Sequence, residues 1–544
     1  MSQRDQPMRE QAIGPDGLTR RDRDIIREVL ARYPDVRRVT LFGSRAMGTF
    51  GRGSDIDLAL EGRDLTPRTL ARIATELEDS DLPYKVDLLL RNDQLEPKLK
   101  AHIRRHGKPF GWELHHTQKL IAQAKLLIGD GYRAKNSELA ISGLPFARAG
   151  NIDNGFHFEN ADRFPEEDLQ KVGEKVSQLG DVVFTSKGTV GRLALVRMNT
   201  PRFVYAPQLC YWRILDCDVI DHRWLYYWMC GSEFIQQVAG MKGQTDMADY
   251  VSLTDQRRME ITLPPIAEQR AIAAVLGALD DKIEQNRRTA RALERLARAI
   301  FRAWFVDFEP VKAKAAGATS FPSMPQPVFD ALPTRFVDSA IGPVPEGWEV
   351  KAITQVATFL NGLALQKYPP RNDGQDLRVI KIAQLRKGSS EGADWANSNV
   401  PEQYVVEDGD LLFSWSGTLD AEFWFGGRGA LNQHLFKVTS AHFPSWFCFL
   451  WIRQHLPDFR AIAAGKATTM GHIQRRHLQE AKVVIPPSDF LQAAVTAIGS
   501  LYDLHAQVMI ESRKLAGMRD YLLPKLLSGQ VRICVDEHNL GETT

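Results

Sequence analysis

The 544-residue sequence has few cysteines, no long apolar run and little net charge, and each shortage excludes a class of protein. The five cysteines are an odd, scattered set without a C-x-x-C pair, which argues against a disulfide framework or a zinc knuckle and favours a reducing compartment. No stretch approaches 18 apolar residues, and FPSWFCFLW (443–451) is long enough only for a buried segment. The start, MSQRDQPMRE, lacks the apolar core of a signal peptide, so we expect a cytoplasmic protein without a membrane partner.

The overall charge and composition are ordinary. Hydrophobic residues make up 44% of the chain and charged residues 25%, as in soluble globular proteins. The formal net charge is +2, so any nucleic-acid surface must come from local clusters of Arg and Lys. The length far exceeds that at which single hydrophobic cores divide, which predicts several domains.

A pattern suited to phosphate chemistry lies near the front, in LFGSRAMGTFGRGSDIDLAL (41–60). Asp55 and Asp57 are two positions apart on an expected strand, so both carboxylates point to one face, and Asp87 on a neighbouring strand can add a third. Clustered carboxylates bind Mg2+ together with phosphate oxygens, and two such ions can assist a phosphoryl displacement. Gly43 and Ser44, at a strand-to-helix turn, can offer backbone N–H groups to a triphosphate. The surrounding apolar spacing predicts helices and strands over 19–33, 36–42, 55–60, 65–79 and 84–90.

An isolated Asp-x-Asp is more often a strand with two solvent-facing carboxylates, but the full pattern is narrower. Gly-Ser, ten residues, Asp-x-Asp and a later apolar-flanked Asp together resemble the minimal nucleotidyltransferase domains of the DNA polymerase β superfamily, over residues 20–112. The resemblance implies an NTP, Mg2+ and transfer of a nucleotidyl group, often AMP. It implies that Gly43 and Ser44 bind the nucleotide, and that Asp55, Asp57 and Asp87 are metal-binding and catalytic. Relatives of such domains often modify a toxin, so a toxin-like protein is one expected acceptor.

Most of the remaining chain consists of two copies of one pattern. LPPIAEQRAIAAVLGALDDKIEQ (263–285) matches IPPSDFLQAAVTAIGSLYDLHAQ (485–507) at an offset of 222. Three upstream pairs also match: GDVVFTSKGTVG (180–191) with GDLLFSWSGTLD (409–420), PFARAGNIDNG (145–155) with VIKIAQLRKG (379–388), and APQLCYWRI (206–214) with LNQHLFKVT (431–439). The last pair aligns Gln208 with Gln433. Each copy is therefore a set of short strands and turns closed by Pro-Pro and a long helix.

The helix after each Pro-Pro carries an apolar seam typical of a coiled coil. The proximal seam follows alternating steps of four and three residues through Ile272, Leu276, Leu279, Ile283, Asn286, Ala290, Leu293, Ala297, Ile300 and Trp304. The distal seam contains Ile498, Leu501, Val508, Leu515, Leu522 and Leu526, with His505 and Arg519 as weaker positions. Asn286 is the polar residue expected to fix the register. The alternative is a pair of ordinary amphipathic core helices, but the repetition favours an antiparallel pair that spaces two globular halves.

These segments support a second resemblance. PPIAEQRAIAAVLGALDDKIEQN, AIFRAWFVDF and RFVDSAIGPVPEGW are similar to the central conserved region of the DNA-specificity subunit of type I restriction–modification systems, with a match over about 115–533. The resemblance implies two target-recognition domains, each reading one half of a bipartite site in double-stranded DNA, with the helices as a ruler. It also implies methyltransferase (modification) and restriction subunits as partners, which use S-adenosylmethionine, ATP and Mg2+, whereas the specificity body needs no cofactor.

The chain lacks the catalytic motifs of the partner subunits and departs from the family pattern in two places. It contains no N-P-P-[FY] methyltransferase motif and no G-x-x-x-x-G-K-[ST] loop. It departs from the family by the extra front domain and by the distal helix, where Asp489, Phe490, Leu491 and Gln492 stand near the place of the proximal E-Q-R. That departure puts in doubt how symmetrically the two helices contact the partner subunits.

The predicted fold is an α+β multidomain chain. The expected segments are a flexible N-terminus (1–18), a nucleotidyltransferase-like α/β domain (19–112), an α+β target-recognition domain (113–265), a proximal helix (266–310), a linker (311–345), a second α+β target-recognition domain (346–487), a distal helix (488–530) and a tail (531–544). The two long helices are expected to pack as an antiparallel coiled coil.

Residues that contact DNA are weakly encoded, because any exposed Arg, Lys or amide can serve. For each candidate a solvated surface side chain is the competing interpretation, and Gln208 and Gln433 can equally stabilise the fold. The candidates are Arg148, Asn151, Lys187 and Gln244 in the first copy, and Lys381, Gln384, Lys387, Gln433, Lys466, Arg475 and Arg476 in the second. Three functions stay open: a DNA-specificity subunit with an attached domain, an active nucleotidyltransferase steered by a DNA-reading body, and a specificity subunit with a degenerate front module. The intact carboxylates argue against the last.

Overall fold

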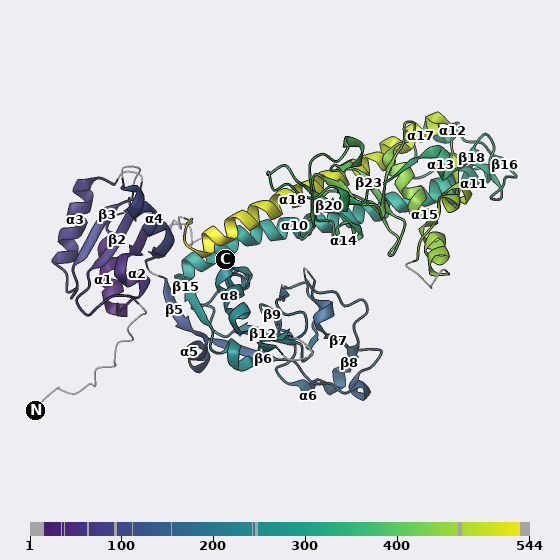
Figure 1. Ribbon diagram of the computed structural model, residues 1–544. Helices are drawn as coiled ribbons and strands as arrows, with labels where there is room; N and C mark the ends of the chain where they lie inside the picture. Colours follow the sequence, from purple (N-terminus) through teal and green to yellow (C-terminus); the bar gives the residue numbers. More distant parts are fainter. Residues whose placement is uncertain are drawn as a thin grey trace, which may run out of the picture. The chain divides into compact units, whose positions relative to one another are not determined.

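The structure is a computed structural model that describes residues 16–33, 35–36, 38–62, 65–91, 95–110, 112–153, 155–241, 243–244, 249–465, 471–531 and 533. The chain divides into two compact units, one made of Met1–Leu279 with Met518–Thr544 and the other of Asp280–Gly517 (Figure 1). Within the described ranges, no helix combines the length and the apolar character needed to cross a membrane.

The first unit begins with a three-layer α/β domain. Its sheet has the order β3-β2-β1-β4, with β2 antiparallel to β1 and parallel to β3. Side chains alternate along β2, so Ile56, Leu58 and Leu60 pack with the residues of α1 and α3, whereas Ala59 packs with Ile103 of α4 on the other face. The elements are α1 (Arg20–Ala31), β1 (Arg38–Phe42), α2 (Gly43–Met47), β2 (Ile56–Glu61), α3 (Pro67–Glu78), β3 (Val86–Leu90), α4 (Pro97–His106) and β4 (Lys108–Pro109).

Helix α1 begins with a reciprocal cap. The Asp22 backbone N–H donates to the Thr19 hydroxyl, and the Thr19 N–H donates to the Asp22 carboxylate. The expectation of a flexible segment over 1–18 is wrong for 16–18, because the Arg23 guanidinium donates to the Asp16 carboxylate at 2.6 Å and Leu18 is fully buried. Residues 1–15 lie outside the described residues.

The first repeat follows in the same unit. Its main sheet has the order β10-β9-β12-β6, and a smaller sheet has the order β11-β7-β8. Its strands are β5 (Glu113–His116), β6 (Leu126–Asp130), β7 (Leu144–Ala147), β8 (Arg163–Phe164), β9 (Val182–Thr185), β10 (Leu193–Leu195), β11 (Val204–Tyr205), β12 (Leu209–Ile214), β13 (Gly243–Gln244), β14 (Asp249–Tyr250) and β15 (Glu260–Leu263). Its helices are α5 (Thr117–Ala122), α6 (Leu169–Val172), α7 (His222–Cys230), α8 (Ser232–Met241) and α9 (Leu253–Gln256).

The second repeat, in Asp280–Gly517, repeats the main sheet of the first, with the order β24-β23-β26-β19. Its second sheet has the order β21-β20-β25-β22, in which β20 and β25 pair in parallel as β7 and β11 do, and β22 is one strand more than the first repeat has there. Its strands are β18 (Glu349–Ala352), β19 (Thr358–Asn361), β20 (Leu377–Ile380), β21 (Trp395–Ala396), β22 (Val405–Val406), β23 (Leu411–Ser414), β24 (Ala421–Phe423), β25 (Gly429–Leu431), β26 (Leu435–Thr439) and β27 (Lys482–Ile485). Its helices are α13 (Ile353–Val356), α14 (Ile382–Lys387), α15 (Ser445–Ala464) and α16 (Arg475–Glu480).

The segment expected to be a linker (311–345) contains helices and strands. It contains α11 (Glu309–Ala315), α12 (Gln326–Asp330), β16 (Phe336–Val337) and β17 (Val344–Pro345). Met324, Phe329 and Leu332 are buried in the main core of the second repeat, together with Trp446 and Phe447 of α15. The apolar stretch FPSWFCFLW therefore lies largely in a buried helix, as the sequence predicted.

The two long helices follow the two Pro-Pro pairs. The proximal helix is α10 (Ile266–Phe301) with a π-helical turn, η4 (Arg302–Val306), and the distal one is α17 (Ser488–Ala494), a π-helical turn η7 (Val495–Gly499) and α18 (Ser500–Leu527). Within Asp280–Gly517 they run antiparallel, since Asn286 of α10 bonds Glu511 whereas Trp304, in η4 after the end of α10, packs on Phe490 (Figure 1). Asn286 is 2% exposed and donates to Glu511 at 2.7 Å, which places a polar contact in the seam as predicted.

Candidate functional site

A group of carboxylates lies on the α4 side of the front domain's sheet. Asp57 and Asp87 are direct neighbours on the parallel strands β2 and β3, and Asp55 immediately precedes β2. Burial, together with the nearby Asp87 and Asp55 carboxylates, raises the pKa of Asp57, while His102 and Arg45 oppose the rise. The carboxylates therefore repel one another, and a bound cation would relieve that repulsion.

The turn between β1 and α2 fits tightly against this group. Gly43 has φ +69°, and a Cβ atom there would lie 2.1 Å from Oδ2 of Asp57. A side chain at residue 43 would therefore collide with the carboxylate, in a backbone conformation that glycine adopts freely. Ser44 follows in the first turn of α2, so the structure brings the predicted Gly-Ser pair to the predicted aspartates.

Arg45 is a site residue that sequence reasoning missed. Its side chain is 1% exposed, lies 4.2 Å from the Tyr84 ring centroid, and donates to the backbone carbonyls of Asp16, Ser54 and Asp55. Arg45 therefore fixes the backbone at Ser54 and Asp55, immediately before β2. The only signal in the sequence was an arginine next to Gly-Ser, which is indistinguishable from a solvated one.

Metal binding at this site stays a prediction. Among the residues that the structure describes, no group of three or more His, Cys, Asp or Glu side chains is arranged to hold a metal ion. Asp87 instead pairs with the half-exposed Lys85 ammonium group at 2.6 Å. The donor set, hard carboxylate oxygens next to a glycine turn, fits Mg2+ and phosphate in kind.

Each repeat carries a second candidate site, which we call its loop frame. In the first repeat the frame consists of the turn 185–192, residue 208 and the segment 249–251. The Thr185 hydroxyl donates to the Thr189 carbonyl at 2.6 Å and accepts from the Arg192 N–H at 2.8 Å, which locks the turn. The Ser186 carbonyl accepts from the Val251 N–H at 2.9 Å, and the Ser186 N–H donates to the Gln208 carbonyl at 2.9 Å.

The loop frame of the second repeat consists of 414–420, residue 434 and the segment 471–473, with the same bonds. The Ser414 hydroxyl donates to the Thr418 carbonyl and accepts from the Asp420 N–H, both at 2.7 Å. The Trp415 carbonyl accepts from the Ile473 N–H at 3.0 Å, and the Trp415 N–H donates to the His434 carbonyl at 3.4 Å. The backbone of the two frames is therefore duplicated bond for bond at these positions.

This duplication corrects the predicted alignment of Gln208 with Gln433. Leu209 pairs with Thr185 in the first repeat and Leu435 pairs with Ser414 in the second, so Gln208 corresponds to His434. The predicted alignment of APQLCYWRI with LNQHLFKVT was one residue out of register because it matched the shared glutamine, whereas the strand pairing matches the shared leucine, Leu209 with Leu435.

Several DNA-contact candidates are engaged within the chain. Arg148 pairs with Asp162 at 2.7 Å, and the Asn151 side chain caps the Arg148 N–H; Lys381 pairs with Asp394, Gln384 caps Lys381, and Lys387 pairs with Glu391. Lys187 lies in the first loop frame and Gln433 borders the second, while Arg475 and Arg476 are exposed at the start of α16. The side chain of Gln244 and all of Lys466 lie outside the described residues.

The architecture defines a class of protein: two matched α+β repeats, each closed by one helix of an antiparallel pair, behind a nucleotidyltransferase-like domain. Two family models match it, "Polymerase beta, Nucleotidyltransferase" over residues 24–110 and "Type I restriction modification DNA specificity domain" over residues 128–295 and 345–505. The second covers more than half of the chain, and the protein belongs to the type I restriction–modification DNA specificity family.

Three individual proteins are similar to this chain. The type I restriction enzyme MjaIX specificity subunit of Methanocaldococcus jannaschii is 23% identical over 68% of this chain and 81% of its own length. The HindI specificity subunit of Haemophilus influenzae is 20% identical over 72% of this chain and 95% of its own length. A solved S subunit of a type I restriction–modification system from M. genitalium covers 76% of this chain and 96% of its own, at 12% identity and a TM-score of 0.47.

Proposed function

We propose that this chain is the DNA-specificity subunit of a type I restriction–modification complex. Each repeat binds one half of a bipartite site in double-stranded DNA, and the antiparallel helices set the gap between the halves. The observation that carries the proposal, beside the family membership, is the duplicated loop frame, because a reader of two half-sites needs one scaffold twice. The protein works in the cytoplasm with methyltransferase and restriction subunits, which use S-adenosylmethionine and ATP.

Domain exchange tests this proposal. Residues 115–262 are replaced by the equivalent segment of another such subunit, the chain is co-expressed with its methyltransferase partner, and methylated adenines are mapped across the genome. We expect one half of the bipartite motif to change and the other to stay. A wild-type chain that directs no bipartite motif, or an exchange that alters both halves, would contradict the proposal.

A second candidate function belongs to the front domain, where Gly43 packs on the Asp57 carboxylate beside Asp87. There Gly43 and Ser44 would hold the triphosphate of an NTP, and Asp55 and Asp57 would hold Mg2+, which supplies charge neutralisation at the phosphates. Asp87 would take the proton of the attacking hydroxyl. A toxin-like protein is the first acceptor to try.

A further inference from the structure

Within the duplicated loop frames, three matched positions carry different polar side chains. Lys187 and Tyr250 form an antiparallel backbone β-bridge in the first repeat, and Ser416 and His472 form one at the matching positions of the second. The third position is filled by Gln208 in the first frame and by His434 in the second, as the shared bonds to residues 186 and 415 define. The backbone is thus held constant while the side-chain donors and acceptors change.

In the second frame these side chains form one polar cluster. The Ser416 hydroxyl and Nδ1 of His434 are 3.0 Å apart, and Nε2 of Gln433 lies 3.4 Å from Nε2 of His434. The Trp415 ring contacts both histidine rings, with its centroid 5.9 Å from that of His434 and 6.3 Å from that of His472. The Trp415 indole N–H donates to Oδ1 of Asn361 at 2.9 Å, and this bond fixes the orientation of the ring that the histidines contact.

In the first frame the corresponding groups have unused bonding capacity. Lys187 is exposed, and its ammonium group makes no ion pair with any residue in the described ranges. Oε1 of Gln208 is buried and has no hydrogen-bond partner within the described structure. A buried acceptor without a donor is costly, so a rotation of this amide that gives it a donor in a complex recovers that cost.

We propose that these six side chains determine the DNA sequence that the protein reads. Lys187 and Tyr250, with the Gln208 amide rotated outward, contact base edges of one half-site, and His434 and His472 contact those of the other. The buried Ser416 hydroxyl, 3.0 Å from Nδ1 of His434, fixes the orientation of that ring. This assignment rests on the proposed DNA-reading function. Lysine and glutamine in one frame and histidine in the other present different donors and acceptors to the major groove, so a fixed backbone with exchanged side chains yields two different half-sites.

The test uses the full chain with its methyltransferase partner. In His434→Ala, the second half of the methylated motif should lose discrimination at one or more bases by about tenfold or more, since a single base contact carries that much. Ser416→Ala should weaken discrimination at the same bases, because it releases the His434 ring. The first half should be unchanged, which reports that the chain is folded and assembled. His442→Ala is the matched control, because His442 is exposed in the same repeat outside the loop frame.

A reciprocal variant tests the first frame. Lys187→Ser combined with Gln208→His and Tyr250→His gives the first frame the three residues of the second. We expect the first half of the motif to change while the second stays. An unchanged motif in both sets of variants would overturn the assignment, and so would the loss of both halves from a change in one frame. Because wild type would still direct a bipartite motif in those cases, the failure is distinct from failure of the proposed function.

Discussion

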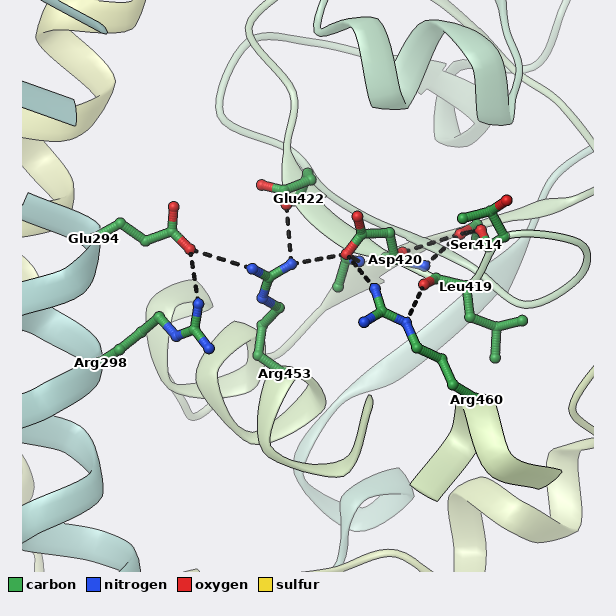
Figure 2. A network of polar contacts seen from close by, with 10 residues as sticks. Glu294, Arg298, Ser414, Leu419, Asp420, Glu422, Arg453 and Arg460 are labelled. Carbon is green, nitrogen blue, oxygen red and sulfur yellow. Dashed lines mark hydrogen bonds and ion pairs between the residues drawn. The ribbon is translucent and has the colours of Figure 1, made fainter. Parts of the chain in front are cut away.

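The guanidinium group of Arg453 in α15 lies 2.7 Å from the Asp420 carboxylate, at the end of the turn that forms the second loop frame (Figure 2). The same group reaches Glu422 of β24 at 3.0 Å and Glu294 of α10 at 3.4 Å. The largely buried Arg453 side chain therefore connects α10, β24 and the second loop frame within Asp280–Gly517. Asp420 also supplies the backbone N–H that the Ser414 hydroxyl accepts.

Arg453→Met should strongly destabilise the second repeat. The change keeps most of the apolar stem but leaves Glu294, Asp420 and Glu422 without their shared cation, and breaking such a group by removing one partner costs about 3 kcal/mol or more. The free energy of unfolding, measured by urea denaturation, should fall by about that amount. Arg460→Met is the control. Arg460 is half-exposed and approaches the Asp420 carboxylate no closer than 3.5 Å, so its loss should lower the free energy of unfolding by less than about 1 kcal/mol. Equal effects of the two substitutions would contradict this account.

The stability of the second repeat should also depend on pH through Glu422. Burial raises the pKa of Glu422 to about 7, although Arg453 lowers it, while Glu294 and Asp420 add to the rise. A raised pKa in the folded state means that this carboxyl contributes most stability below its usual value of 4.5, and that the contribution is lost as the pH rises through about 7. Unfolding midpoints measured between pH 5 and pH 8 should therefore fall less in Glu422→Gln than in wild type.

The control for this pH dependence is Glu407→Gln, an exposed carboxylate paired with Arg428 in the same repeat. Its midpoints should follow those of wild type across the range. The size of the effect at Glu422 is moderated by solvent, since its side chain is 37% exposed. If the unfolding midpoints of wild type and Glu422→Gln changed with pH in parallel, Glu422 would not be the group responsible for the pH dependence.

The elements that follow from local spacing could be predicted from the sequence. The Pro-Pro pairs mark the start of α10 and α17, and the four-three spacing places Ile272, Leu276 and Asn286 on the buried side, because helical periodicity is a local property. The Gly-Ser and Asp-x-Asp spacing also placed Gly43 against Asp57, since both lie at the ends of adjacent strands β1 and β2.

The remaining features depend on contacts between distant residues. The loop frame joins Ser186 to Val251, and no local pattern encodes that bond. Asn151 and Gln384 stay predicted DNA contacts, and in the structure each side chain also caps the backbone N–H three residues before it. Arg45 became recognisable only when the fold placed three backbone carbonyls around it. For Ser186 and Arg45 the residue type suited several roles, and contacts with distant parts of the chain decided between them.

Lengthening the helix pair should lengthen the gap in the DNA site. Asn286 opposite Glu511 sets the register, so four residues are inserted after Thr289 and four after Gln507, near matching levels of the two helices. The insertions add about 6 Å and about one turn, which preserves the seam. That length is close to two base pairs at a rise of about 3.4 Å, so the mapped motif should keep both halves with a longer spacer.

The control inserts two residues at each of the same places. Two residues rotate the following helix by about 200°, which turns the seam away from its partner, so assembly and methylation should be lost. An unchanged spacer with full methylation after the four-residue insertions would show that the helices do not set the gap.

The front domain should be separable from the DNA reader. In Asp55→Ala with Asp57→Ala, both carboxylates expected to gather Mg2+ at a triphosphate are gone, so transfer of labelled nucleotide from ATP to a protein or nucleic-acid acceptor should vanish. The repeats have their own hydrophobic cores, so the mapped DNA motif and the methylation rate should stay close to wild type. The domain should not lose stability at neutral pH, because the pKa of Asp57 is raised in the fold and its ionised form is disfavoured there.

Hydrogen exchange supplies a readout that is independent of the acceptor. Mg2+ with a non-hydrolysable ATP analogue should slow exchange around Gly43 and Ser44 in wild type but not in the double variant. Glu78→Ala with Asp79→Ala is the matched control, since both residues are exposed at the end of α3, and it should respond as wild type does. Loss of methylation in the Asp55 and Asp57 variant would make the front domain part of the DNA reader. Absence of both nucleotide protection and transfer in wild type would favour a degenerate module, because a carboxylate cluster that binds no Mg2+–nucleotide retains only its cost in repulsion.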